Sequence, residues 1–154
     1  MKILGLDPGY GIVGWSIVEK NFKLVDYGSI ETSSQEKIEN RLFFIHTKLN
    51  EIINFYQPDC AAVEKIFFTK NSKTIIDVSK AIGVISLTLK LHNLSFGEYT
   101  PLQIKKAMTG FGRASKEQMQ TIMKMMFKLK EIPKPDDAAD ALAVAACHSF
   151  SLIN

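Results

Sequence analysis

Four acidic side chains in distant parts of the chain have the types and settings that metal chemistry requires: Asp7, Glu64, Asp137 and Asp140. Apolar residues flank each of them, so we expect folding to bring the carboxylates close together. Like charges at short range raise one another's pKa and destabilise the fold unless a cation or a proton lies among them. Carboxylate oxygens are hard ligands that suit Mg²⁺ or Mn²⁺. The set therefore predicts a divalent-metal site.

A pair of such ions, about 3.5 to 4 Å apart, can hydrolyse a phosphodiester, because one activates water and the other stabilises the departing oxygen. This chemistry needs no histidine and no nucleophilic serine. The three histidines, His46, His92 and His148, show no metal-ligand spacing and lie in helical stretches. Packing or solvation is therefore their expected role.

Taken singly, two of the acids have simpler explanations. Asp7 opens an Asp-Pro-Gly segment, where aspartate often serves only to form a turn. Asp137 falls in the first turn of an expected helix, where the helix dipole stabilises an acid without any ligand. Glu64 is harder to explain locally, because it follows Ala-Ala-Val in a strand that helices should cover and a buried unpaired charge is costly. The prediction depends on the conjunction of the four.

Length and composition predict one domain, residues 1–154, with 46% apolar residues to build its core. The net charge is only +3, but basic residues crowd the chain after Phe68, where the acids are few and partly gathered in Asp136, Asp137 and Asp140. This distribution predicts a basic surface around an acidic pit, which suits a polyanion. A scattered, solvated lysine face is the alternative explanation.

Cysteine usage and hydropathy indicate where the protein works. Cys60 and Cys147 lie in apolar stretches without pairing or metal-type spacing, so we expect both to be reduced core residues. The chain begins directly with a strand pattern, and no run approaches the roughly 18 apolar residues that a membrane span requires. We therefore expect a cytoplasmic protein with no membrane partner.

The strand patterns predict a mixed sheet. Strands are expected at Lys2–Asp7, Ile12–Glu19, Lys23–Glu31, Cys60–Glu64 and 95–99. The first three are joined by tight turns and should form an antiparallel meander. The fourth is reached through a helix and should pair parallel to the first. Asp7 and Glu64 would then end adjacent parallel strands.

Two long helices are expected in the first two thirds of the chain. Thr32, Ser33 and Ser34 offer capping hydroxyls before an amphipathic helix at Ile38–Tyr56. The segment 72–92 has helical period and two apolar stripes, of which one can cover the sheet. The other stripe needs a partner, either another helix of this chain or the same helix of a second subunit, and we favour a homodimer. That second stripe consists of Ile76, Val84, Leu87 and Leu91.

Three further helices are expected after the fifth strand. Thr100 with Pro101 opens a short helix running toward Gly110, and a flexible basic loop, 110–113, follows it. Ser115 with Gln118 forms a capping-box pattern, and the next helix has an inner stripe of Met119, Ile122, Met123, Met126 and Leu129. Asp136 is the expected cap of the last helix. Asp137 and Asp140, three residues apart, should share one of its faces.

Several segments together resemble a known family. GLDPGYGIVGWSI, PDCAAVEKIFFTKN, GFGRASKEQMQ and KPDDAADALAVA are similar, in the same order, to segments of the bacterial RuvC Holliday junction resolvases. The resemblance runs from Met1 to about Phe150. It implies an α/β, ribonuclease H-like fold with a five-stranded mixed sheet, order 3-2-1-4-5, flanked by helices on both faces. It also implies a homodimer that cuts two strands of a four-way DNA junction symmetrically, and a branch-migration motor complex as partner.

Matched by position, the family's metal-binding acids fall on Asp7, Glu64, Asp137 and Asp140, which implies two Mg²⁺ ions per active site, with Mn²⁺ as a substitute. Asp136, beside Asp137, departs from the family pattern, and the D-A-A-D spacing selects Asp137 as the ligand.

The resemblance also assigns residues to DNA. Lys105 and Lys116 match basic residues near the scissile phosphate and the DNA backbone, and Lys116 is expected to stabilise phosphate charge during catalysis. Arg113, in the basic loop, joins them. Phe67 matches an aromatic residue that stacks on a base at the junction centre, with Phe68 as the alternative one position away.

Two other function classes remain open on the sequence. The D-P-G-Y-G-I-V-G segment also resembles the first phosphate loop of actin-like ATP-handling domains, although those proteins place the nucleotide between two such domains and 154 residues hold only one. A DNA-binding module without catalysis is the other alternative. It predicts salt-sensitive binding that is indifferent to metal.

Overall fold

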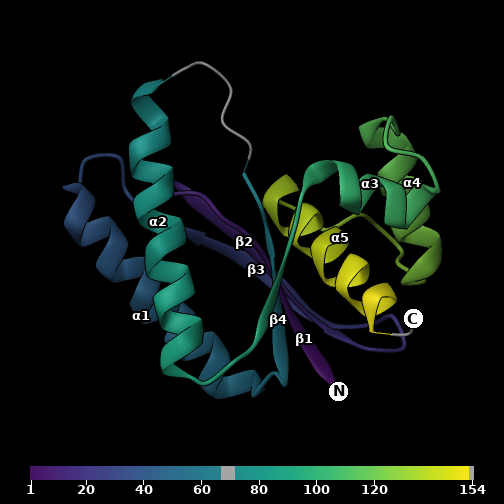
Figure 1. The fold of residues 1–154 in the computed structure, drawn as a ribbon, viewed down its shortest axis with the longest axis horizontal. Coiled ribbons are helices and arrows are strands. Elements are labelled where there is room, and N and C mark those ends of the chain that lie inside the picture. The colour runs from purple at the N-terminus through teal and green to yellow at the C-terminus, as the bar shows by residue number, and fades with distance from the viewer. Residues whose placement is uncertain (67–71, 153–154) are drawn as a thin grey trace.

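The computed structural model describes residues 1–66 and 72–152, which form a five-stranded sheet with helices on both faces (Figure 1). The strands are β1 (Lys2–Asp7), β2 (Ile12–Glu19), β3 (Lys23–Glu31), β4 (Cys60–Glu64) and β5 (Phe96–Tyr99). The helices are α1 (Ile38–Tyr56), α2 (Ser72–Leu91), α3 (Pro101–Thr109), α4 (Lys116–Met126) and α5 (Asp136–Ser151).

The strand order is β3-β2-β1-β4-β5, which confirms the predicted topology. β1, β2 and β3 pair antiparallel, as expected for strands joined by short turns. β4 pairs parallel with β1 and with β5. This is expected, because α1 lies between β3 and β4 in the chain and α2 lies between β4 and β5. The fifth strand begins at Phe96, one residue later than predicted.

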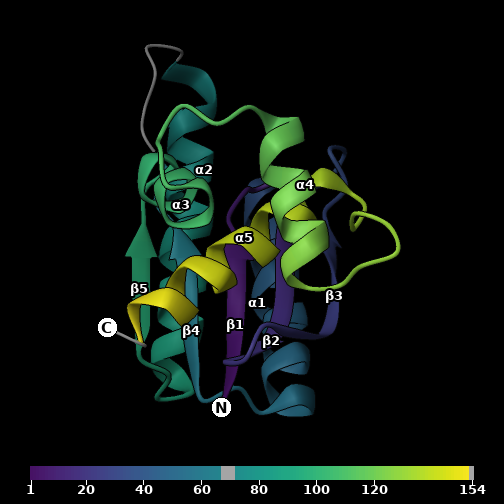
Figure 2. The same cartoon turned by 90° about the vertical axis from the view of Figure 1, so that its right-hand side faces the viewer.

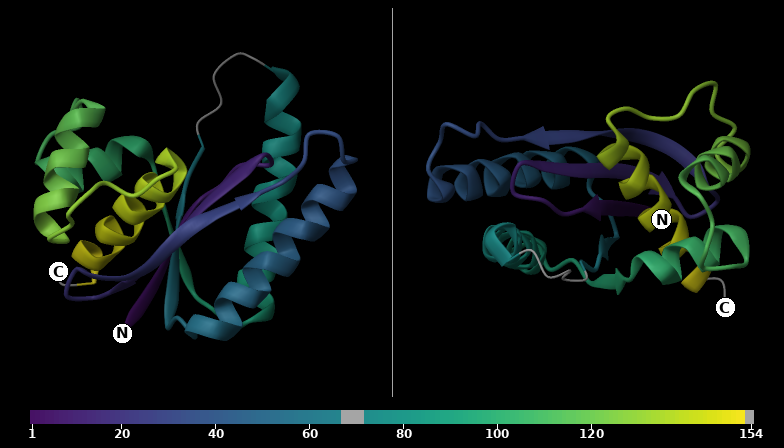
Figure 3. Two further views of the ribbon diagram at one scale, coloured as in Figure 1. Left: turned by 180° about the vertical axis from the view of Figure 1, so that it is seen from behind. Right: turned by 90° about the horizontal axis from the view of Figure 1, so that it is seen from above.

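The two faces of the sheet are covered by different helices, as Figures 2 and 3 show. Helices α1 and α2 cover one face and enclose a cluster of aliphatic side chains that includes Leu6, Ile17 and Ile85. Helix α5 lies across the other face, with α3 and α4 packed outside it. Cys60 and Cys147 are buried and free in this second core, as predicted.

Helix starts are partly as predicted. Capping boxes open α3 at Thr100 with Gln103 and α4 at Ser115 with Gln118. The prediction that Asp136 caps the last helix is wrong: Pro135 is the N-cap residue, without a side-chain hydrogen bond, and Asp136 is the first helical residue. Proline is compatible with this place because the N-cap residue has extended backbone angles (φ −67°, ψ 176°).

The hydroxyls before α1 are also used differently from the prediction. Lys37 is the N-cap residue of α1 and makes no side-chain cap bond. The hydroxyl of Thr32 instead donates to the carbonyl of Tyr10, in the loop between β1 and β2. The C-terminal ends also differ from the prediction, because α2 ends at Leu91 and α4 ends at Met126. Leu129, predicted in the inner stripe of α4, therefore lies after this helix and packs on the core from there.

The second apolar stripe of α2 faces solvent. Ile76, Leu87 and Leu91 are 62%, 58% and 63% exposed, whereas Val84 packs against the core. Among the residues that the structure describes, no helix covers these three side chains, so the intrachain alternative for this stripe finds no support. None of the described helices is both long and apolar enough for a membrane span.

Candidate metal centre and cleft

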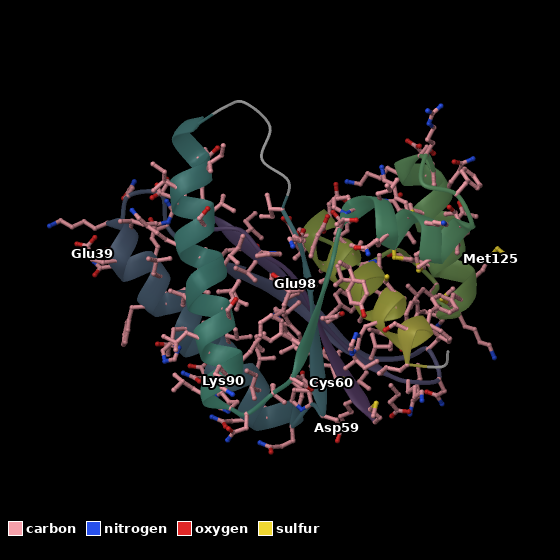
Figure 4. The ribbon with its side chains drawn as sticks, in the orientation of Figure 1. Glu39, Asp59, Cys60, Lys90, Glu98 and Met125 are labelled. Carbon is pink, nitrogen blue, oxygen red and sulfur yellow. The ribbon has the colours of Figure 1, made fainter. Side chains whose placement is uncertain are left out.

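The carboxyl ends of β1 and β4 bring the first two acids side by side. Leu6 is in register with Val63 in this parallel pair, and Asp7 and Glu64 are the next residues along their strands. Asp59 and Cys60, labelled in Figure 4, mark the opposite end of β4. The carboxyl edge of parallel strands is where α/β sheets commonly build their sites.

Close contact between α5 and the sheet brings the other two acids to the same edge. Gly14 of β2 is in register with Asp7 of β1, and a Cβ atom at Gly14 would collide with the carbonyl of Asp137. A Cβ at Gly5 would collide with the carbonyl of Ala141, to which the buried hydroxyl of Ser16 donates at 3.0 Å. The helix backbone therefore rests directly on the sheet, with its first turn beside Asp7.

The charges of Glu64, Asp137 and Asp140 all act on the carboxyl of Asp7. Burial raises the pKa of Asp7 to about 8, with further contributions from the charges of Glu64, Asp140 and Asp137 and from a hydrogen bond to Glu64. Burial and the charge of Asp140 raise the pKa of Glu64 to about 7. In the absence of a cation the fold therefore favours the protonated forms of these two carboxyls, and protonation is one of the two ways in which close carboxylates are stabilised.

Asp140 has a mixed environment. Its side chain is exposed on the side of a cleft, while partial burial and the charges of Asp136 and Asp137 raise its pKa, opposed by the charge of Lys116. In the described part of the chain, no three His, Cys, Asp or Glu side chains converge closely enough to enclose an ion. Of the four acids, Glu64 and Asp140 line a common cleft.

A cleft of about 250 Å³ opens beside these acids. Its lining residues come from β4 and from α3, α4 and α5: Glu64, Pro101, Ile104, Lys105, Lys116, Met119, Gln120, Met123, Asp140 and Ala143. Acids and lysines thus line the same cavity, and the charge of Lys105 acts to lower the pKa of Glu64. The outer face of α4 is on the far side, where Met125 points to solvent (Figure 4).

Lys116 is paired in a way that the sequence did not predict. Its ammonium donates to the carboxylate of Asp136 at 2.6 Å, and both side chains are exposed. This hydrogen bond is the main reason that the pKa of Lys116 is raised. An exposed pair of this kind contributes only about 0–1 kcal/mol, so Lys116 can exchange Asp136 for another anion at small cost.

The remaining predicted residues lie elsewhere or outside the described range. Arg113 is exposed in the loop between α3 and α4. Phe67 and Phe68 fall outside the described residues. The histidines are packing residues, as expected: the ring of His148 is buried and bonds the hydroxyl of Tyr99 at 2.7 Å, and burial lowers its pKa.

Sequence reasoning missed Gly14 and Ser16, although both determine how α5 sits on the sheet. A signal for Gly14 was present, because an isolated glycine within a strand pattern often marks the close approach of another backbone. Ser16 carried no comparable signal. An alternating strand does not reveal which of its polar residues will be buried.

Comparison with known proteins identifies the family. The family model described as crossover junction endodeoxyribonuclease RuvC matches residues 3–148. The chain belongs to the RuvC family. RuvC from Caldicellulosiruptor saccharolyticus is 55% identical and RuvC from Halothermothrix orenii 52% identical, with 98% of this chain and 93% of each relative covered. RuvC proteins form a family of metal-dependent nucleases.

A solved RuvC structure has the same fold. Thermus thermophilus RuvC, in complex with a Holliday junction substrate, matches with a TM-score of 0.94 and 31% sequence identity over 99% of this chain and 94% of that one. This match confirms the expected ribonuclease H-like architecture. RuvC membership also favours the nuclease hypothesis over the actin-like ATP-handling alternative.

Substitution of Gly14 by alanine should separate α5 from the sheet. The added methyl group meets backbone that cannot move aside as a side chain would, so we expect a loss of about 1–3 kcal/mol in the free energy of unfolding, measured by urea denaturation. Gly83→Ala is the matched control, because its Cβ would meet nothing within 4 Å. A Gly14→Ala protein as stable as the wild type would contradict the close seating of α5.

The stability of the metal-free protein should fall as the pH rises. Asp7 and Glu64 titrate at about 8 and about 7 in the fold, against ordinary values of 3.8 and 4.5. Between these limits the native state holds protons that the unfolded chain has lost, so unfolding becomes easier with each rise in pH. We expect the Tm in a chelating buffer to drop from about pH 5 to about pH 8, and the drop to be smaller in Asp7→Asn. A pH-independent difference in Tm between the two proteins would contradict the raised pKa of Asp7.

Proposed function

We propose that this chain is a Mg²⁺-dependent endodeoxyribonuclease that resolves four-way DNA junctions by paired, symmetric nicking. The observation that carries this proposal is the match to the RuvC family across residues 3–148, with acids at all four positions of the resemblance. A relative solved with a Holliday junction substrate aligns over 99% of the chain, which supports the same substrate class here.

The residues present fit a pair of divalent ions. Asp7, Glu64, Asp137 and Asp140 would hold them, since all four offer hard carboxylate oxygens. The pKa values of Asp7 and Glu64 are raised because burial and neighbouring acids disfavour the charged carboxylates, and a bound cation would favour those charged forms instead. We infer that Mg²⁺ is the ion used, with Mn²⁺ able to substitute. When bound, such ions supply an activated water and neutralise charge that grows on the phosphate.

The protein's own side chains have separate tasks around the scissile phosphate. Glu64 and Asp140 line the cleft together with Lys105 and Lys116, so a DNA strand would bring its phosphate within reach of both acids and lysines. Lys116 would exchange Asp136 for phosphate oxygen and stabilise the charge there. Either Asp7 or Glu64 would help to orient the attacking water.

DNA would contact a wider surface than the cleft. Arg113 is exposed beyond α3 and is available to a phosphate. Phe67 would stack on a base at the centre of the junction, with Phe68 as the alternative. These two assignments depend on the family resemblance.

A second copy of the chain would supply the second cut. Ile76, Leu87 and Leu91 expose a row of apolar side chains along α2, and a two-fold axis at this row would bury the same helix of both subunits. A branch-migration motor complex is the further partner that the family implies. We also place this activity in the cytoplasm, where chromosomal DNA is available to it.

The non-catalytic alternative is a module that recognises junction shape only. It accounts for the lysines of the cleft but does not explain why Asp7 and Glu64 are partly buried beside further acids. Junction cleavage with and without Mg²⁺ separates the two hypotheses.

Asp7→Asn should remove nicking of a synthetic four-way junction and leave junction binding intact. Removing even an outer partner of a metal ligand costs about 10- to 100-fold, so we expect loss of a ligand to lower the nicking rate by more than about 100-fold. Gel assays of nicking in Mg²⁺ and of binding in chelator measure the two effects. Asp77→Asn, on α2 and paired with Lys80, is the control. Normal cleavage by Asp7→Asn would contradict the assigned role.

Leu87→Asp should convert the dimer to monomer. A charge placed in an apolar contact is costly to bury, and sedimentation velocity should report a single monomeric species where the wild type sediments as a dimer. Leu102→Asp alters a side chain of similar exposure, 62%, on a different helix and should leave the dimer unchanged. The assigned interface is wrong if Leu87→Asp remains dimeric.

A further inference from the structure

Arg41, near the start of α1, holds the loop that follows Asp7. Its guanidinium lies over the ring of Tyr10, 4.6 Å from the ring centroid. Its Nε donates to the hydroxyl oxygen of Thr32 at 2.8 Å. Thr32 in turn donates its hydroxyl proton to the carbonyl of Tyr10 at 2.6 Å. One side chain from α1 therefore contacts the loop both directly and through Thr32.

The loop at residues 8–11 has little freedom once these contacts form. The amide of Thr32 donates to the carbonyl of Gly11 at 2.9 Å, and Gly9 lies so close to the carbonyl of Ile12 that a Cβ would not fit. The loop begins at the residue after Asp7 and joins the two strands that pair at Asp7 and Gly14, so a change in its conformation is transmitted first to that carboxylate.

The contacts of Arg41 depend on the planar geometry of its guanidinium group and not on an ion pair with an acid. Glu31 and Glu36 line the same groove as Arg41, but among the residues that the structure describes no carboxylate lies within 4.0 Å of its guanidinium. A planar guanidinium can stack on a ring and direct Nε at a hydroxyl at the same time. A lysine ammonium cannot reproduce this geometry.

We propose that Arg41 is a positioning residue, which holds the loop at residues 8–11 through Tyr10 and Thr32 and so fixes the Asp7 carboxylate for metal binding. This inference rests on the proposed function of Asp7. The competing explanation for the same arginine is a direct contact with a DNA phosphate, which would require its charge and not its shape.

Amide hydrogen exchange at Thr32 reports on the loop without DNA or metal. In Arg41→Ala and in Arg41→Lys we expect this amide to exchange about tenfold faster than in the wild type, because its acceptor at Gly11 is no longer held in place. Lys48→Ala removes another cation of α1, paired with Glu51, and should leave the exchange of Thr32 unchanged. Thr32→Val provides a second variant that breaks the same chain of contacts.

Metal and DNA assays on these proteins complete the test. Arg41→Ala, Arg41→Lys and Thr32→Val should each raise the Mg²⁺ concentration for half-maximal nicking by about tenfold and weaken the Mn²⁺-induced rise in Tm. Junction binding in chelator should stay at the wild-type level. The Arg41→Ala and Thr32→Val double variant should be no worse than either single variant, because both changes break one unit.

Three results would overturn the proposal. Unchanged exchange at Thr32 in both Arg41 variants would show that the arginine does not hold the loop. Full nicking activity of Arg41→Lys would assign Arg41 to a DNA phosphate if Arg41→Ala also binds the junction more weakly in chelator. The salt dependence of junction binding by Arg41→Ala should then have a slope lower by about 1. Faster exchange with normal metal dependence would separate the loop from Asp7. A wild-type protein that does not nick junctions would instead refute the proposed function, while the exchange result would still stand.

Discussion

Direct contact between the backbone of α5 and the sheet is the constraint on which the candidate site depends. Gly5 and Gly14 leave room for the carbonyls of Ala141 and Asp137, and the alanines of α5 let the helix be buried along nearly its whole length. A helix seated at a larger distance would still form a core. It would not bring its first acidic turn to the ends of β1 and β4.

This packing creates an electrostatic conflict that the fold leaves unresolved. Asp7 and Glu64 are partly buried beside the acids of α5, and their raised pKa values show that the folded protein favours their protonated forms. A sequence selected only for stability would replace such residues, because an apolar pair of similar size avoids the desolvation penalty. Local conflicts of this kind are concentrated at functional sites. The hydrophobic cores on the two faces of the sheet offset the destabilising effect of these acids.

The parts of the molecule that follow local rules could be predicted from the sequence. Strand alternation and connection lengths predicted the antiparallel meander and the parallel pairing of β4 with β1, whereas the full sheet order came from the family resemblance. Thr100 caps α3, and Ser115 with Gln118 caps α4, as expected. Two of the predicted helix caps were wrong, and in both cases the polar side chain bonds a residue that is distant in sequence. Asp136 pairs with Lys116, twenty residues away in sequence, and Thr32 bonds the loop after β1.

The acids of the candidate site were predictable only as a set, since Glu64 was conspicuous as a charge after a core pattern while Asp7 and Asp137 each had a simpler local explanation. The contacts that position them were not, because they join distant segments. The most direct test of the whole account is anomalous diffraction from crystals of this protein grown with Mn²⁺. We predict two peaks about 3.5 to 4 Å apart, bound by oxygens of Asp7, Glu64, Asp137 and Asp140. Manganese bound elsewhere, with these four carboxylates left without a metal ion, would contradict it.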